Sequence, residues 1–277
     1  MQESKMYPIG KPGQKWGSEE RQEWLMRQWV QRSYADEVTA RVKELPGQFI
    51  VNTYGELSQA GTRYPLWVIS NGAWDDAKPG VLITGGVHGY ETSGVQGAIR
   101  FLQTRAEDYS DRFNIVVAPC VSPWAYETIN RWNPMAIDPN RSFYASSPCE
   151  ESASLMDYLS ARQLQFTAHF DLHETTETDN TEFRPALAAR DGVEHKNWHI
   201  PDGFYSVGDA QKPAAAFQAA IIASVERVTH IAPPDPDGKI IGEALQQRGV
   251  INYEARDRKS TRLNSSHSQQ SRMPSSA

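Results

Sequence analysis

Cysteine is scarce in this chain, whose 277 residues include only Cys120 and Cys149. Two cysteines are too few for a disulfide framework or for a zinc site made of thiolates, so we expect two ordinary half-buried thiols. Long apolar runs are also missing, because no stretch of about 18 apolar residues occurs, and this excludes a membrane-spanning helix. The N-terminus has no apolar region of the secretory type. We therefore expect a cytoplasmic protein that does not act at a membrane.

An excess of positive charge is absent as well. The 28 Lys and Arg residues are outnumbered by 34 Asp and Glu residues, and the formal net charge is −6. Such a balance offers no electrostatic basis for binding nucleic acid or an anionic membrane. Hydrophobic residues make up 39% of the chain, which is enough for the core of one large or two small globular domains.

The last 21 residues, 257–277, differ in composition from the rest. Seven of them are serine, and no hydrophobic period is visible. A polar tail of this kind is typical of disordered chain. Its two pieces, DRKSTRLNSSH and SRMPSSA, also resemble the translation of a sequencing-library adapter. On that hypothesis the tail is not native, the natural C-terminus is missing, and residues 257–277 are excluded from reasoning about the fold.

The remaining chain alternates between helical and β-like patterns. Apolar residues recur every three or four positions over 18–45, which predicts one or two amphipathic helices ending at Pro46-Gly47. Strand-like and helix-like stretches then follow one another at 48–57, 64–72, 80–86, 93–109, 113–123, 152–163, 166–176, 214–230 and 249–255. This order predicts an α/β fold with a twisted mixed, largely parallel sheet and helices on both faces. We expect one domain over 48–256 and an N-terminal helical extension over 1–47.

A glycine-rich elbow, GGVHGYETSG, follows the strand-like VLITG and precedes a helix. It places His88 and Glu91 three residues apart, and the glycines let the backbone fold back so that both can face one ion. The other interpretation is a turn whose polar residues are incidental. A phosphate-binding loop is disfavoured, because the elbow lacks the Lys-Ser/Thr ending of a P-loop and the spacing of a dinucleotide site.

A second histidine, His173, stands where the strand-like stretch 166–176 ends. Ligands collect at the carboxyl ends of strands in sheets of this type, so His173 is the candidate third metal ligand. His169 and Asp171 have the same parity as His173 and point to the same face. We expect Asp171 to orient an imidazole and His169, deeper in the strand, to be structural.

Other polar residues near these motifs allow more than one interpretation. The acidic run after His173 is either a solvated loop or a set of groups that support the metal-binding histidines or recognise a cation: Glu174, Glu177, Asp179 and Glu182. The remaining loop histidines are expected at the surface or in packing roles: His195, His199 and His230.

The segment IDPNRSF carries Asn140 and Arg141 directly after Pro139. A guanidinium binds carboxylate with two parallel hydrogen bonds, and an asparagine adds another donor. This pair is either a carboxylate-binding site or a surface accident. Arg131, in TINRWNP, is a candidate second cation for an oxyanion.

Three motifs in this order resemble the zinc carboxypeptidase superfamily, which includes aspartoacylase and succinylglutamate desuccinylase. They are H-x-x-E after VLITGG, Asn-Arg in DPNRSF, and the distal DLHETT, and the likeness spans roughly residues 78–185. The forms D-x-N-R-x-F and D-L-H-x-T are closer to the aspartoacylase and desuccinylase branch than to the digestive carboxypeptidases. The resemblance implies a zinc carboxypeptidase-like fold.

The resemblance also assigns roles. His88, Glu91 and His173 would hold one zinc ion per chain. A substrate carboxylate would bind Asn140 and Arg141, and Arg131 would polarise the scissile carbonyl. The implied activity is hydrolysis of an amide bond next to a carboxylate, in a small peptide or an N-acyl amino acid, so carboxypeptidase and deacylase both stay open. The oligomeric state is left open too.

Members of this superfamily use a catalytic glutamate on a late strand. Glu254, in GVINYEAR, fits that place. In the desuccinylase-like branch the glutamate is expected further on, beyond the start of the adapter-like tail. If it is missing, this chain is a truncated homologue that binds metal and catalyses poorly.

Overall fold

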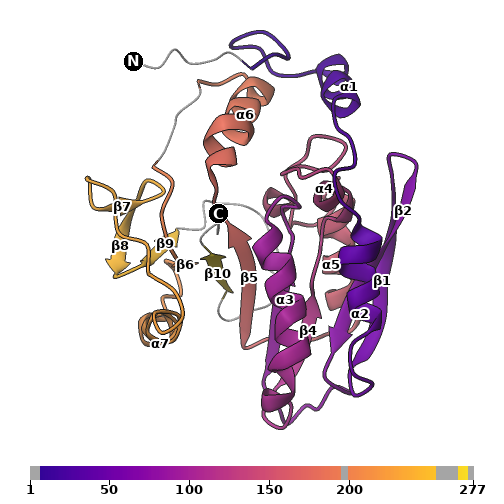
Figure 1. Ribbon diagram of the computed structural model, residues 1–277, viewed down its shortest axis with the longest axis vertical. Helices are drawn as coiled ribbons and strands as arrows, with labels where there is room; N and C mark the ends of the chain where they lie inside the picture. The colour runs from indigo at the N-terminus through magenta and orange to yellow at the C-terminus, as the bar shows by residue number, and fades with distance from the viewer. Residues whose placement is uncertain (1–6, 195–198, 254–267, 274–277) are drawn as a thin grey trace.

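The computed structural model, drawn in Figure 1, describes residues 7–194, 199–253 and 268–273. Its strands are β1 (Ile50–Gln59), β2 (Thr62–Ser70), β3 (Gly80–Gly85), β4 (Asn114–Ala118), β5 (Ala168–Glu174), β6 (Tyr205–Asp209), β7 (Lys239–Ile240), β8 (Glu243–Gln247), β9 (Val250–Tyr253) and β10 (Ser268–Met273). Its α-helices are α1 (Ser18–Met26), α2 (Arg41–Lys43), α3 (Thr92–Thr104), α4 (Pro123–Glu127), α5 (Glu150–Ala161), α6 (Arg184–Asp191) and α7 (Ala215–Val225). Short 3-10 or π-helical turns are η1 (Ala35–Ala40), η2 (Ala106–Tyr109), η3 (Pro139–Arg141) and η4 (Asp179–Phe183).

The strands form one mixed sheet in the order β1-β2-β4-β3-β5-β10-β6-β9-β8-β7. The central neighbours β4, β3, β5 and β10 are parallel, and so are β6 and β9. The prediction of a largely parallel sheet is confirmed for this centre only, because the edges are antiparallel. The cause is local: two-residue turns at 60–61 and 241–242 have positive φ at both positions, the geometry of a tight hairpin.

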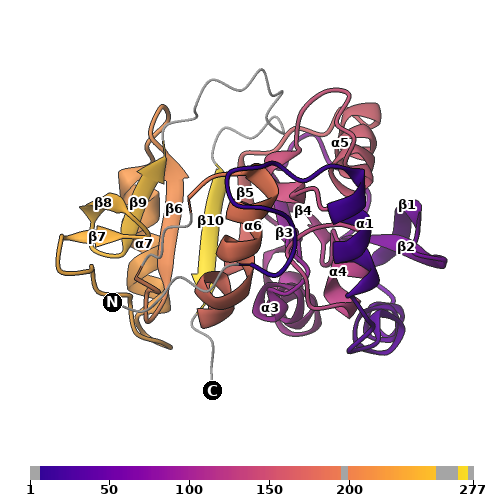
Figure 2. The same cartoon turned by 90° about the horizontal axis from the view of Figure 1, so that it is seen from above.

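Helices cover both faces of the sheet, as Figure 2 shows from above, with α3 on one face and α5 on the other. The strand side chains alternate accordingly. Ile83 of β3 belongs to the core cluster that includes α3, whereas its neighbour Leu82 belongs to the cluster that includes α5. Because every second residue of a strand faces the same side, polar residues of β5 at 169, 171 and 173 share one face.

The N-terminal helices pack into the main core. Trp24 of α1, Tyr34 and Val38 are buried in the same cluster as the strands β2, β3 and β4. The ring of Trp24 lies 6.1 Å from Trp124 and 5.6 Å from Trp132, measured between centroids. The helical pattern over 18–45 thus splits into α1 and the η1–α2 pair, and both bury apolar side chains against the sheet domain, whereas Trp29 and Val30 between them are exposed.

One segment of the tail has a place that we did not expect. Residues 268–273 form β10, which pairs in parallel with β5 and antiparallel with β6. We excluded this stretch from the fold because it resembles a translated adapter, and it also shows no hydrophobic period. Strand pairing is made by backbone groups, so an extended segment can join two strand edges without such a period. The adapter origin of residues 257–277 stays a prediction.

Some elements carry little pattern in the sequence. We did not predict β6, α6 or the β7–β8 hairpin. All five residues of β6 are buried, although the stretch YSVGD contains only two hydrophobic residues. Among the described residues, no helix combines the length and the apolar character needed to cross a membrane.

Candidate metal centre

The glycine-rich elbow connects β3 to α3. Gly86 has φ +59°, a backbone conformation that residues other than glycine rarely adopt. Gly89 is needed for a different reason, since a Cβ at this position would lie 2.0 Å from the carbonyl carbon of Ala125 in α4. The elbow therefore turns sharply at Gly86 and presses its backbone against α4 at Gly89.

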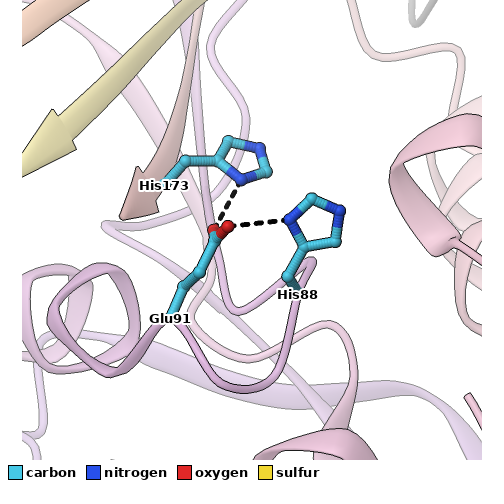
Figure 3. A group of neighbouring side chains, drawn as sticks. All are labelled: His88, Glu91 and His173. Carbon is cyan, nitrogen blue, oxygen red and sulfur yellow. Dashed lines mark hydrogen bonds and ion pairs between the residues drawn. The ribbon is translucent and has the colours of Figure 1, made fainter. Parts of the chain in front are cut away.

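Three side chains converge beside this elbow, as Figure 3 shows. The Nδ1 atom of His88 lies 2.8 Å from one carboxylate oxygen of Glu91, and the Nδ1 atom of His173 lies 2.6 Å from the other. All three side chains are fully buried. One donor atom of each lies within 4.8 Å of the others, so the three could hold a single metal ion.

The far nitrogen of each imidazole is also held. Nε2 of His173 lies 2.8 Å from Asp171, and Nε2 of His88 lies 3.1 Å from Asp138. Such carboxylates place the ring proton on Nε2 and direct the Nδ1 lone pair toward a metal. Asp171 lies where its parity in the strand placed it. We did not predict Asp138, although it stands two residues before Asn140 in the motif that we singled out.

A hydrogen-bonded layer supports Asp171 from the neighbouring strand. Thr84 of β3 lies opposite Asp171 in the parallel β3–β5 register. Its hydroxyl donates to Oδ1 of Asp171 at 2.7 Å and lies 2.8 Å from Nε2 of His169. His169 is thus part of the packing beneath the centre and is not one of the three converging donors.

The electrostatics of the centre keep its carboxylates charged. Burial raises the pKa of Glu91, but His173 and His88 lower it by more, so the net pKa is well below its usual range. Burial lowers the pKa of His173, but Asp171 and Glu91 raise it by more, to about 9. Burial also raises the pKa of Asp138, which Arg131 and His88 bring well below normal. Without a metal, His173 is therefore a positively charged imidazolium at neutral pH.

This set of donors fits a divalent metal. Two imidazole nitrogens and one carboxylate are the protein ligands typical of a catalytic zinc site, where further positions are left to water or substrate. The extra proton of His173 gives this site a positive charge, which the carboxylates of Glu91 and Asp171 favour. A bound metal would replace that positive charge.

Arg131 is joined to the centre through Asp138. Its Nε lies 3.3 Å from Oδ2 of Asp138, and one terminal nitrogen lies 3.6 Å from Asp179. The hydroxyl of Tyr90 donates to both oxygens of Asp179 at 2.9 and 3.0 Å. Tyr90 itself belongs to the elbow, between His88 and Glu91, so one of the two carboxylates that fix Arg131 is hydrogen-bonded to the elbow.

The Asn140–Arg141 pair lies in η3, next to Asp138. Arg141 is exposed, and its charge is one of the influences that lower the pKa of Asp138. Asn140 is half-buried. The structure therefore brings the predicted carboxylate-binding pair close to a carboxylate that contacts His88.

The remaining sequence candidates are scattered. Glu174 is buried and accepts hydrogen bonds from the backbone and hydroxyl of Ser93 at the start of α3, and Asp179 is buried against Arg131. The solvated-loop interpretation therefore holds only for the exposed members of the run, Glu177 and Glu182. His199 and His230 are exposed. Glu254 and His195 lie outside the described residues.

The chain is similar to known proteins in its sequence family and in its fold. Residues 77–220, just over half of the chain, match the family described as succinylglutamate desuccinylase/aspartoacylase catalytic domain. No curated protein sequence matches the chain.

Solved structures share the fold. A protein described as a candidate metallopeptidase from Shewanella amazonensis SB2B aligns with a TM-score of 0.63 and 17% identity, over 90% of each chain. A metallo-carboxypeptidase from Burkholderia cenocepacia aligns with a TM-score of 0.55 and 18% identity, over 89% of this chain and 60% of that one. At 17% and 18% sequence identity, these similarities show a shared fold and nothing further.

Proposed function

Because the chain belongs to the succinylglutamate desuccinylase/aspartoacylase catalytic-domain family, we propose that it is a zinc-dependent hydrolase of an amide bond next to a carboxylate. One observation carries this proposal. The Nδ1 atoms of His88 and His173 converge on Glu91, while both Nε2 atoms are held by aspartates. That is the arrangement of a metal centre whose ligands are oriented before the ion binds.

Zinc bound by these three side chains would supply a Lewis acid that polarises an amide oxygen and lowers the pKa of a water molecule. The chain's own groups do the rest. Asp138 and Asp171 fix the two ring planes, and Arg131 holds a permanent positive charge next to Asp138. We assign Arg131 to the negative charge that develops on the amide oxygen, since a charge fixed in advance needs no reorganisation during the reaction.

We assign Asn140 and Arg141 to the substrate carboxylate. The exposure of Arg141 and its place beside Asp138 support this role. Glu254, which follows β9 directly, is assigned to proton transfer from the attacking water to the leaving amine. The substrate is a small peptide with a free C-terminal carboxylate or an N-acyl amino acid.

Metal analysis combined with hydrolysis assays tests the proposal. We expect about one zinc per chain, as three protein ligands to a single ion imply, and hydrolysis of either N-acyl amino acids or peptides with a free C-terminus. His88→Ala should lose both zinc and hydrolysis, whereas Glu254→Gln should keep zinc and lose hydrolysis. A wild-type protein that binds no metal overturns the proposal.

Two other results would change parts of the proposed function. Hydrolysis that survives in Glu254→Gln would move the proton-transfer role to another residue. Zinc binding without hydrolysis of either substrate class would support the alternative of a metal-binding, catalytically impaired homologue.

A further inference from the structure

The segment between α1 and η1 lies along the end of α4. The backbone N–H of Gln31 donates to the carbonyl of Glu127 at 2.8 Å, and its side-chain amide donates to the carbonyl of Thr128 at 2.9 Å. The side chain of Asn130 donates to Gln28 at 2.6 Å. This part of the N-terminal region is therefore bound to the same short stretch of chain, 125–130, against which the elbow packs.

Arg32 extends from this segment to the elbow itself. Its Nε donates to the carbonyl of Tyr126 at 2.6 Å, and one terminal nitrogen donates to the carbonyl of Gly89 at 2.8 Å. The other terminal nitrogen donates to the hydroxyl of Thr92. The guanidinium also stacks on the ring of Tyr126, with its central carbon 3.6 Å from the ring centroid.

Each elbow partner of Arg32 directly follows a metal ligand. Gly89 follows His88, and Thr92 follows Glu91. A single planar cation therefore ties the residue after each ligand to α4. Its fork of donors suits this task, whereas a lysine offers one point charge and cannot reach three acceptors in a plane.

The elbow also has a backbone hydrogen bond to the stretch 125–130, from the N–H of Tyr90 to the carbonyl of Asn130 at 2.9 Å. The close packing of Gly89 against Ala125 also restricts the position of the elbow. Removing Arg32 would release the Gly89 carbonyl and the Thr92 hydroxyl together, so the separation of His88 and Glu91 would depend on the Tyr90–Asn130 bond and the packing of Gly89 alone.

We propose that Arg32 is a positioning residue of the metal centre, and that the N-terminal segment contributes to metal affinity through it. The inference rests on the metal binding in the proposed function. It gives the N-terminal region a role at the site, in addition to covering the sheet.

The test is a Zn²⁺ titration of full-length, chelator-treated protein with Arg32→Ala, Arg32→Lys and a matched control, Arg41→Ala. Arg41 is half-buried like Arg32 and lies in the same N-terminal region, but it contacts Gln96 and Gln103 on α3. We expect Arg32→Ala to weaken zinc binding by about tenfold or more, the loss typical of an outer partner of a metal site. Arg32→Lys should restore only part of the affinity, and Arg41→Ala should bind zinc like the wild type.

Thermal unfolding of the metal-free variants separates positioning from attachment. If Arg32→Ala binds zinc with wild-type affinity and only its melting temperature falls, Arg32 merely attaches the N-terminal segment and the proposal is overturned. If Arg32→Ala does not fold, Thr92→Val and Arg32→Lys decide, and wild-type zinc affinity in both overturns it. A wild type that binds no zinc contradicts the proposed function instead.

Discussion

At the scale of single residues, His173 is the most constrained group of the centre. Its Nδ1 faces Glu91 at 2.6 Å, its Nε2 faces Asp171 at 2.8 Å, and none of its surface is exposed. Because these carboxylates raise the pKa of His173 to about 9, both nitrogens carry a hydrogen at neutral pH in the metal-free protein. A metal can use Nδ1 only after that hydrogen has left.

The first prediction concerns the pH dependence of metal binding. The pKa of His173 is raised to about 9, so zinc uptake displaces one proton at neutral pH. Zinc affinity should rise about tenfold per pH unit between pH 7 and 9 and become flat above. Competition with a chelator of known affinity, measured at several pH values, checks this. An affinity that does not change between pH 7 and 9 would contradict it.

The same group affects the stability of the metal-free protein in the opposite sense. A folded pKa above the unfolded value of about 6.5 means that the charged imidazole stabilises the fold fully below that pH. This contribution is lost as the pH rises through about 9. Denaturant unfolding of chelated protein should therefore show a free energy of unfolding that falls across this window.

Asp171 provides the second prediction. Asp171→Asn keeps an oxygen near Nε2 of His173 but removes the charge that stabilises the imidazolium. Above pH 9, where His173 is neutral in both proteins, zinc affinity should fall by about 10- to 100-fold, as for other carboxylates behind a metal-bound histidine. The pH at which affinity levels off should also move down, because Asp171 is the largest influence that raises the pKa of His173. The exposed Asp157 of α5, changed to Asn, is the control.

At the scale of elements, the centre is assembled from the loop after β3, the last residues of β5 and the segment before η3. The turn η4 adds Asp179, which contacts Arg131 at 3.6 Å and accepts hydrogen bonds from Tyr90 and from the backbone of Thr176. Asp179 therefore fixes Arg131 without touching the converging donors. This arrangement separates metal binding from the placement of the nearby cation.

The third prediction follows from that separation. Asp179→Asn should leave zinc content unchanged, whereas hydrolysis should fall by up to about 100-fold, since small displacements of a charged group are costly in the transition state. Zinc analysis and kcat on the same preparation check both parts. Glu177→Gln, an exposed neighbour in the same loop, should behave like the wild type. Loss of zinc in Asp179→Asn would show that Arg131 and the metal ligands are not separable.

At the scale of the whole molecule, the N-terminal region and the sheet share one core. Trp24 is 2% exposed and packs on Trp124 and Trp132, which lie on either side of the stretch that supports the elbow. Trp16 and Arg190 extend this layer, through a backbone bond of 3.0 Å and a cation over the Trp132 ring. The layer connects α1 with α4 and α6.

The fourth prediction tests this shared core. Trp24→Ala should lower the free energy of unfolding by about 3–5 kcal/mol, the usual cost of deleting a buried aromatic ring. Trp29→Ala, at a side chain that is 68% exposed, should change it by less than about 0.5 kcal/mol. Urea denaturation of the two variants checks this. Equal effects would mean that α1 is not part of the cooperative unit.

The local sequence predicted much of this molecule because its pattern is short-range. The apolar run in VLITG and the alternation in FTAHFDL predict strands, and polar residues that follow a strand must lie at its carboxyl end. His88, Glu91 and His173 could be selected in this way, and parity along the strand predicted that Asp171 faces the same side. The antiparallel edges of the sheet and β6 were not predicted, because tight turns and a weakly apolar strand carry little pattern.

The sequence alone determined which residues could bind a metal, since imidazole and carboxylate groups were placed at strand ends by periodicity. Apart from Asp171, only the tertiary structure decided which groups hold those residues in place. Asp138 approaches His88 from 50 positions away, and Arg32 contacts Gly89 from 57 positions away. Contacts over such separations depend on how α1, α4 and η3 pack on the sheet, and packing is a property of the folded whole that no short stretch of sequence contains.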